Sequence, residues 1–285
     1  MINRKITSVY LPTLKQGFLG PGHTARGLLE PMNYKQTNPF ILLMEDTIKV
    51  SGGEPVGGAH PHAGFETATL TVYNNLSGEN KTGTFELLTA GSGVIHTETT
   101  YEPVDMQILQ LWLVLPKKNR SAEPLHQDIG LQTVPTKAIG ASSIRVYSGS
   151  SNGITSPIQN QTPLILVDAE MVANSTINHD LPSSYTSFFV VLDGKVAVGD
   201  KTVKKGEVAW LDKSSDEEES HISFTTGESS ARFILYAGEP QEESIVSYGP
   251  FIADTEDDIK RLRYEYGHGK FPHLNDLDAS RVKKY

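Results

Sequence analysis

Short runs of apolar, β-branched and aromatic residues alternate with polar turns along most of the chain. Residues 68–73 and 106–115 have the length and composition of strands, and Pro116 closes the second run. Residues 38–44 begin with Asn-Pro and continue as an apolar run, which predicts a turn leading into a buried strand. This pattern predicts an all-β fold.

A second β-rich block extends from about residue 144 to residue 246. Within it, residues 188–200 predict a hairpin that turns at the Asp-Gly pair 193–194, with another turn at 199–200. Residues 117–140 separate the two blocks, and we expect them to form a linker.

The C-terminal part of the chain has a helical pattern. Asp254 or Thr255 can cap a helix whose first turn is acidic and whose later residues are basic, an order that suits the helix dipole. Gly267 is the expected stop at the position after the helix.

The two β-rich blocks resemble each other weakly, since residues 83–87 align with residues 206–210. This internal repeat predicts two copies of one barrel in tandem, followed by a short C-terminal helix. We expect a first domain over residues 1–135, a second over 136–247, and an extension over 248–285.

Composition and charge exclude several classes of function. The chain has 285 residues, of which 38% are hydrophobic and 21% charged, as in ordinary globular proteins. Its net charge of −9 argues against direct nucleic-acid binding, because phosphate contacts need a basic face. The absence of cysteine excludes disulfides, thiolate metal sites and cysteine nucleophiles. The sequence shows no signal peptide and no apolar stretch that could span a membrane, so we expect a cytoplasmic protein.

Two pairs of candidate metal ligands share the spacing i, i+2. His60 and His62 flank Pro61, and His96 and Glu98 follow in the next predicted strands. Side chains two positions apart on a strand point the same way, and Pro61 biases His60 toward an extended conformation. Two such strands can bring three imidazoles and one carboxylate to a single centre. This ligand set suits a mid-row divalent ion such as iron and leaves room for exogenous ligands.

The second block lacks an equivalent set. The internal repeat aligns Leu181 and Ser183 with the first pair of ligands, and Glu219 and His221 with the second pair. A leucine and a serine cannot replace two imidazoles, so we expect the metal site only in the first barrel.

Two further residues near the ligand motifs have alternative interpretations. Glu66 lies four residues after His62, where it is either a hydrogen-bond partner for a ligand imidazole or a polar residue at a barrel rim. Trp112 is either a core residue or a platform for a substrate.

These motifs resemble those of the pirin family of bicupins, and the resemblance extends from about residue 38 to residue 271. The matching segments are His60-Pro61-His62-Ala63-Gly64-Phe65-Glu66-Thr67, Thr89-Ala90-Gly91-Ser92-Gly93-Val94-Ile95-His96-Thr97-Glu98, Leu111-Trp112-Leu113-Val114-Leu115-Pro116, Gly238-Glu239-Pro240 and Tyr248-Gly249-Pro250-Phe251. The resemblance implies two cupin (jelly-roll) barrels. It also implies iron at the positions of His60, His62, His96 and Glu98.

The sequence departs from the family pattern at several positions around the expected site. Residues 44–46 replace an Asp-His-Phe type triplet, and the hairpin near residues 74–80 is shorter than in relatives. Ala63 and Ser92 stand where relatives tend to have arginine, and Leu87 stands where they have tryptophan.

The resemblance implies quercetin 2,3-dioxygenase activity, in which a flavonol and O2 react with ring opening and loss of carbon monoxide. Glu98 would be both a metal ligand and the base that takes the substrate hydroxyl proton. We expect one divalent ion per chain, iron(II) in the cell, although a purified sample can carry nickel, copper, zinc or manganese. The alternative is an iron-dependent binding protein without turnover, since eukaryotic members are associated with transcriptional co-regulation. That role implies a protein partner and a nuclear location in a eukaryote. We expect a monomer.

Overall fold

The computed structural model describes residues 2–30, 34–53, 57–75, 81–97, 101–214 and 219–285. Two compact units divide the chain, and each draws on distant parts of the sequence. The unit with the candidate histidines, called the first barrel below, comprises Leu14–Gln36, Phe40–Gln132 and Gln241–Tyr285. The other, called the second barrel, comprises Met1–Thr13, Thr37–Pro39 and Thr133–Pro240. The domain boundaries expected at residues 135 and 247 stay a prediction.

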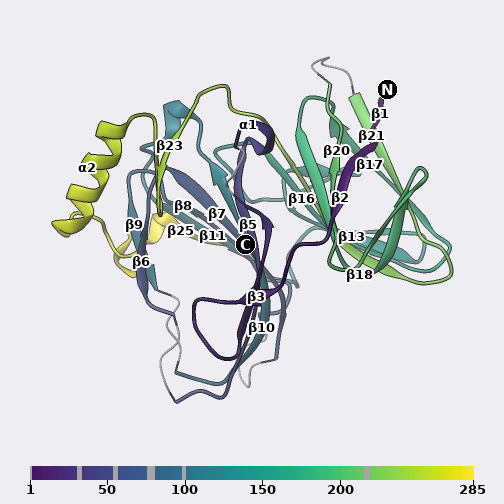
Figure 1. Cartoon of the computed structure of the whole chain (residues 1–285), viewed down its shortest axis with the longest axis horizontal. Helices are drawn as coiled ribbons and strands as arrows, with labels where there is room; N and C mark the ends of the chain where they lie inside the picture. Colours follow the sequence, from purple (N-terminus) through teal and green to yellow (C-terminus); the bar gives the residue numbers. More distant parts are fainter. Residues whose placement is uncertain (1, 31–33, 54–56, 76–80, 98–100, 215–218) are drawn as a thin grey trace. The chain divides into compact units, whose positions relative to one another are not determined.

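The first barrel is built around one large sheet. Its eight described strands lie in the order β25-β11-β8-β7-β10-β5-β4-β3 (Figure 1). Their bounds are β3 (Lys15–Gln16), β4 (His23–Leu29), β5 (Phe40–Val50), β7 (Phe65–Asn74), β8 (Phe85–Thr89), β10 (Val104–Val114), β11 (Leu125–Ile129) and β25 (Val282–Lys284). The strands expected over 68–73 and 106–115 correspond to β7 and β10.

Two further strand pairs belong to the first barrel. β6 (Ala59–His62) pairs with β9 (Val94–Thr97), and β23 (Val246–Tyr248) pairs with β24 (Phe251–Ala253). The short helical segments of this unit are α1 (Tyr34–Thr37, which continues into the other unit at its last residue), η2 (Lys117–Asn119), η3 (Leu274–Asp276) and η4 (Ala279–Arg281).

In the second barrel, eleven described strands form one sheet around an apolar core that includes Phe189, Phe224 and Phe233. Their bounds are β1 (Ile2–Asn3), β2 (Ile6–Tyr10), β12 (Thr136–Ile139), β13 (Ser142–Ser148), β16 (Leu164–Met171), β17 (Thr176–Pro182), β18 (Thr186–Val198), β19 (Lys201–Lys204), β20 (Val208–Leu211), β21 (Glu219–Thr225) and β22 (Ala231–Gly238); a small pair consists of β14 (Ser150–Ser151) and β15 (Ile154–Thr155).

Two predictions about local structure were wrong. The Asp-Gly pair 193–194 does not end a strand, because β18 continues through it and forms a bulge against β22. The hairpin turn lies at 199–200, as the second part of that prediction had it, since Val198 pairs with Lys201. The expected linker over 117–140 contains η2, β11 and β12, because β11 pairs with β8 and β12 pairs with β13.

The C-terminal helix begins where the sequence predicted. Thr255 caps α2 (Glu256–Gly267), and its hydroxyl accepts a hydrogen bond from the Asp258 amide at 3.1 Å. Among the described residues, no helix has the length and apolar character needed to cross a membrane.

The end of α2 differs from the prediction. Gly267 is its last residue, but the left-handed residue that stops the helix is Gly269, with φ of 67°. The amide of Lys270 donates to the carbonyl of Glu265 at 3.0 Å, which closes the helix as a Schellman motif. The chain then turns back toward β9.

Candidate metal centre

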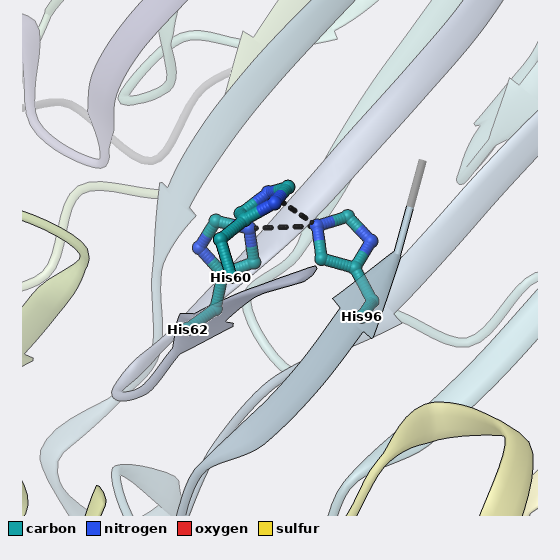
Figure 2. Close-up of side chains that lie close together, drawn as sticks. All are labelled: His60, His62 and His96. Carbon is teal, nitrogen blue, oxygen red and sulfur yellow. Dashed lines mark hydrogen bonds between the residues drawn. The ribbon is translucent and has the colours of Figure 1, made fainter. Parts of the chain in front are cut away.

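The three candidate histidines meet on the β6–β9 pair, called the ribbon below. His60 lies directly opposite His96, and His62 lies two residues further along β6 (Figure 2). The Nε2 atom of His96 is 2.7 Å from Nε2 of His60 and 3.0 Å from Nε2 of His62. Two nitrogens that bind one ion at about 2.1 Å and at a right angle are about 3 Å apart, so this spacing is that of neighbouring ligands.

The proton positions on the rings also fit a shared cation. Nδ1 of His60 lies 2.9 Å from the carbonyl oxygen of Gly58, so Nδ1 carries the proton and Nε2 of the neutral ring presents its lone pair. A proton on Nε2 of His96 can serve only one of its two close contacts. At least one of these close contacts therefore has no hydrogen between its two nitrogens, whose lone pairs repel each other. A divalent ion that accepts the lone pairs of all three Nε2 atoms removes this repulsion.

Burial keeps the rings of His62 and His96 neutral. Burial, followed by the nearby rings of His96 and His60, lowers the pKa of His62 to about 2. Burial, followed by His60 and His126, lowers the pKa of His96 to about 4. At neutral pH a metal ion therefore displaces no proton from either ring.

Aromatic rings line the buried side of the site. The ring of His62 contacts Phe65 and Trp112 edge-on, with centroid separations of 5.2 and 5.4 Å. Phe65 is fully buried, and Trp112 packs against the same apolar cluster. The packing of Trp112 agrees with a core role, and its indole also borders the metal-ligand candidate His62. Sequence reasoning did not single out Phe65, whose available signal was its place three residues after His62.

The remaining candidates are less directly placed. Glu66 is fully buried on β7 and accepts a hydrogen bond from the Thr89 hydroxyl at 2.7 Å. Its predicted hydrogen bond to a ligand imidazole stays a prediction. Glu98 lies outside the described residues, so the fourth ligand stays a prediction as well.

The second barrel has a different residue set at the aligned position. The internal repeat aligned Leu181 with His60 and Glu219 with His96, so Leu181 should lie opposite Glu219. In the structure the pairing differs by one residue, because Leu181 lies opposite Ser220. Ser220 is buried, and His221 next to it lies on the other face of β21. Within the described parts of the chain, His60, His62 and His96 are the one group of three or more His, Asp or Glu side chains close enough to share an ion.

Comparison with known proteins identifies the fold family. Residues 23–113 match the family model described as Pirin, and residues 166–272 match the one described as Pirin C-terminal cupin domain. The solved structure of GK1651 from Geobacillus kaustophilus is 30% identical, with a TM-score of 0.75, and the match covers 85% of this chain and 99% of that chain. The chain belongs to the pirin family of bicupins.

Two further relatives support this assignment. The chain is similar to Pirin-1 of Arabidopsis thaliana, with 28% identity over 269 residues that cover 88% of this chain and 89% of the relative. It is also similar to the crystal structure of quercetin 2,3-dioxygenase from Acinetobacter baumannii. That match has 27% identity and a TM-score of 0.81, and it covers 94% of this chain and 98% of that chain. The predicted all-β fold of two cupin barrels with a C-terminal helix is therefore confirmed.

Proposed function

We propose that this pirin-family protein binds one divalent metal ion, iron(II) in the cell, and uses it to open the ring of a flavonol such as quercetin with O2. The observation that carries the proposal is the convergence of the Nε2 atoms of His60, His62 and His96. Similarity to the quercetin 2,3-dioxygenase of Acinetobacter baumannii supports the substrate class. Glu98 completes the proposed ligand set.

The chain prepares the three imidazoles before any ion binds. When bound, a divalent ion supplies Lewis acidity that lowers the pKa of the flavonol 3-hydroxyl. The carbonyl of Gly58 fixes the tautomer and orientation of His60. Burial against Phe65 and Trp112 keeps His62 neutral and excludes water from that side of the ring.

Glu98 has two proposed roles. As a ligand, its carboxylate adds one negative charge to three neutral imidazoles. As a general base, it takes the proton of the substrate hydroxyl, a role that its i, i+2 spacing from His96 in the sequence supports.

Metal analysis of purified protein, combined with oxygen uptake in the presence of quercetin, tests the proposal. We expect bound metal and quercetin-dependent oxygen uptake by iron-loaded protein. If iron-loaded protein consumes no oxygen with any flavonol, the proposed dioxygenase activity is rejected. The alternative, a binding protein controlled by its iron state, would then be preferred. A chain that binds no metal would reject both.

A further inference from the structure

We propose that the C-terminal segment 250–273, called the clasp below, holds the ribbon in its metal-binding geometry, so that order in the clasp and metal binding are energetically coupled. The inference rests on the proposed metal site. It assigns positioning roles to residues far from the ligands in the sequence, foremost Phe271.

The ribbon needs support from outside the main sheet. In the described part of the chain, β6 and β9 pair with each other and form no ladder with the eight-stranded sheet. Each strand has four residues. An isolated pair of short strands is at best marginally stable in water, so other contacts have to hold the three imidazoles in place.

The clasp contacts the β6 side of the ribbon through its backbone. Ala63, which directly follows His62, donates its amide hydrogen to the carbonyl of Pro250 at 3.1 Å and accepts one from Ile252 at 2.9 Å. Gly64 has φ of 84°, and a Cβ atom there would lie 1.9 Å from the carbonyl oxygen of Ile252. Glycine at this position therefore permits the close approach of the clasp.

The clasp contacts the β9 side in the same manner. Ile95, which directly precedes His96, donates its amide hydrogen to the carbonyl of Pro272 at 2.9 Å. The ring of Phe271 covers Gly93, where a Cβ atom would lie 2.4 Å from the ring. The aromatic ring of Phe271 thus packs directly against the turn that leads into β9.

A single apolar cluster joins both contacts. Ala63 of the β6 end and Ile95 of β9 pack in one cluster with side chains of the clasp (Figure 1 shows α2 beside β6 and β9). The clasp residues of this cluster are Phe251, Ala253, Ile259, Leu262 and Phe271. The clasp therefore fixes the two strands relative to each other, and with them the neighbouring side chains of His62 and His96.

Such an arrangement makes metal binding and clasp order mutually dependent. If an ordered clasp raises metal affinity by some factor, bound metal shifts the clasp toward its ordered form by the same factor. Metal should then slow hydrogen exchange at the amides of Ile95 and Ile252, which donate across the contact between ribbon and clasp.

A matched pair of truncations tests the coupling. Phe271→Ala removes the ring from the clasp, and Phe85→Ala removes the same ring from β8, where Phe85 is fully buried opposite Leu70 and Ile129. We expect Phe271→Ala to raise the Kd for Ni²⁺, measured against a competing chelator, at least about tenfold, which is about 1.4 kcal/mol. Phe85→Ala should change it less than about threefold. Phe271→Leu and Phe85→Leu form the milder pair if an alanine variant does not fold, and Phe271→Leu should restore part of the affinity.

Hydrogen exchange provides the second readout. In the parent, Ni²⁺ should slow exchange at Ile95 and Ile252, and in Phe271→Ala it should protect them much less. If the Phe271 and Phe85 variants lose the same amount of metal affinity, the loss comes from lower stability of the whole unit. That result would overturn the coupling. Parental affinity in Phe271→Ala would also overturn it. A parent that binds no Ni²⁺, Fe²⁺ or Zn²⁺ would instead reject the proposed metal site, and the coupling with it.

Discussion

The Nε2 atoms of His60 and His96 lie 2.7 Å apart because these residues, 36 positions apart in the sequence, are direct partners in an antiparallel pair. Side chains of directly opposite residues come close by the geometry of the pair itself. The third ring, His62, reaches the same point through alternation along β6. The register of two four-residue strands thus creates the candidate metal centre.

Removing His96 should weaken metal binding itself. His96 contacts both other rings, so His96→Ala deletes the nitrogen shared by both contacts. We expect affinity for Fe²⁺ or Ni²⁺ to fall at least about 100-fold, since even residues that only orient ligands are worth 10–100-fold. His221→Ala, which removes a histidine on β21 of the second barrel, is the control. Equal metal content in both variants would contradict the assignment of His96.

Replacing Glu98 should separate the roles of ligand and base. Glu98→Gln retains three imidazoles and should keep much of the iron. It should nevertheless reduce quercetin turnover by roughly 10²–10⁴, the usual contribution of a positioned base. Glu102→Gln, a change of the same kind four residues later, should leave both iron and turnover near the parental values. Parental turnover by fully iron-loaded Glu98→Gln would show that another group takes the proton.

The second barrel should contribute nothing to the metal site. We expect one equivalent of metal per chain. We also expect His221→Ala to keep metal content and oxygenase activity within about twofold of the parental values. A twofold change in rate corresponds to less than about 0.5 kcal/mol in activation free energy. The reason is that the ligand-aligned Leu181 lies opposite Ser220, while His221 lies on the other face of β21. Two equivalents, or a tenfold loss of activity without unfolding, would refute this prediction.

His179 should make the second barrel less stable in acid. It is fully buried, and burial lowers its pKa to about 4. Nδ1 lies 3.0 Å from the hydroxyl of Ser151 and 3.2 Å from the side-chain nitrogen of Asn152, an amide that can only donate. The folded chain therefore holds the ring neutral, whereas the unfolded chain takes up a proton near pH 6.5.

The sign of the pH effect follows from this difference. The contribution of neutral His179 to the free energy of unfolding is complete above pH 6.5 and is lost as the pH falls toward 4. For the parent, we expect protonation of His179 to reduce the free energy of unfolding by roughly 3 kcal/mol over this pH range. In His179→Gln this contribution to the pH dependence should be absent. Urea unfolding of both proteins with chelator present, at several pH values, measures it. Parallel pH dependence in the two proteins would show that His179 is not responsible.

Local features of the fold could be predicted from the sequence. The i, i+2 spacing placed His60 and His62 on one side of a strand, because alternation is a property of any extended backbone. Thr255 was one of two expected caps, because a cap depends on the few residues that follow it. The barrels and the ligand motifs were likewise recognisable from residue patterns within short segments.

Pairing and register were decided by the tertiary structure. The Asp-Gly pair 193–194 has the composition of a hairpin turn, yet both residues pair with β22, and β19 continues the pairing from Lys195. The irregularity of β18 is a bulge between Val191 and Asp193. The alignment of His221 with a ligand position was off by one register step, and one step moves a side chain to the other face of a strand. The contact of Phe271 with Gly93 carries no signal in either segment alone. The sequence by itself determined which side chains share a face, since that follows from the local backbone. Which strands and segments meet depends on the burial of apolar surface between residues distant in the chain, and only the folded structure decides it.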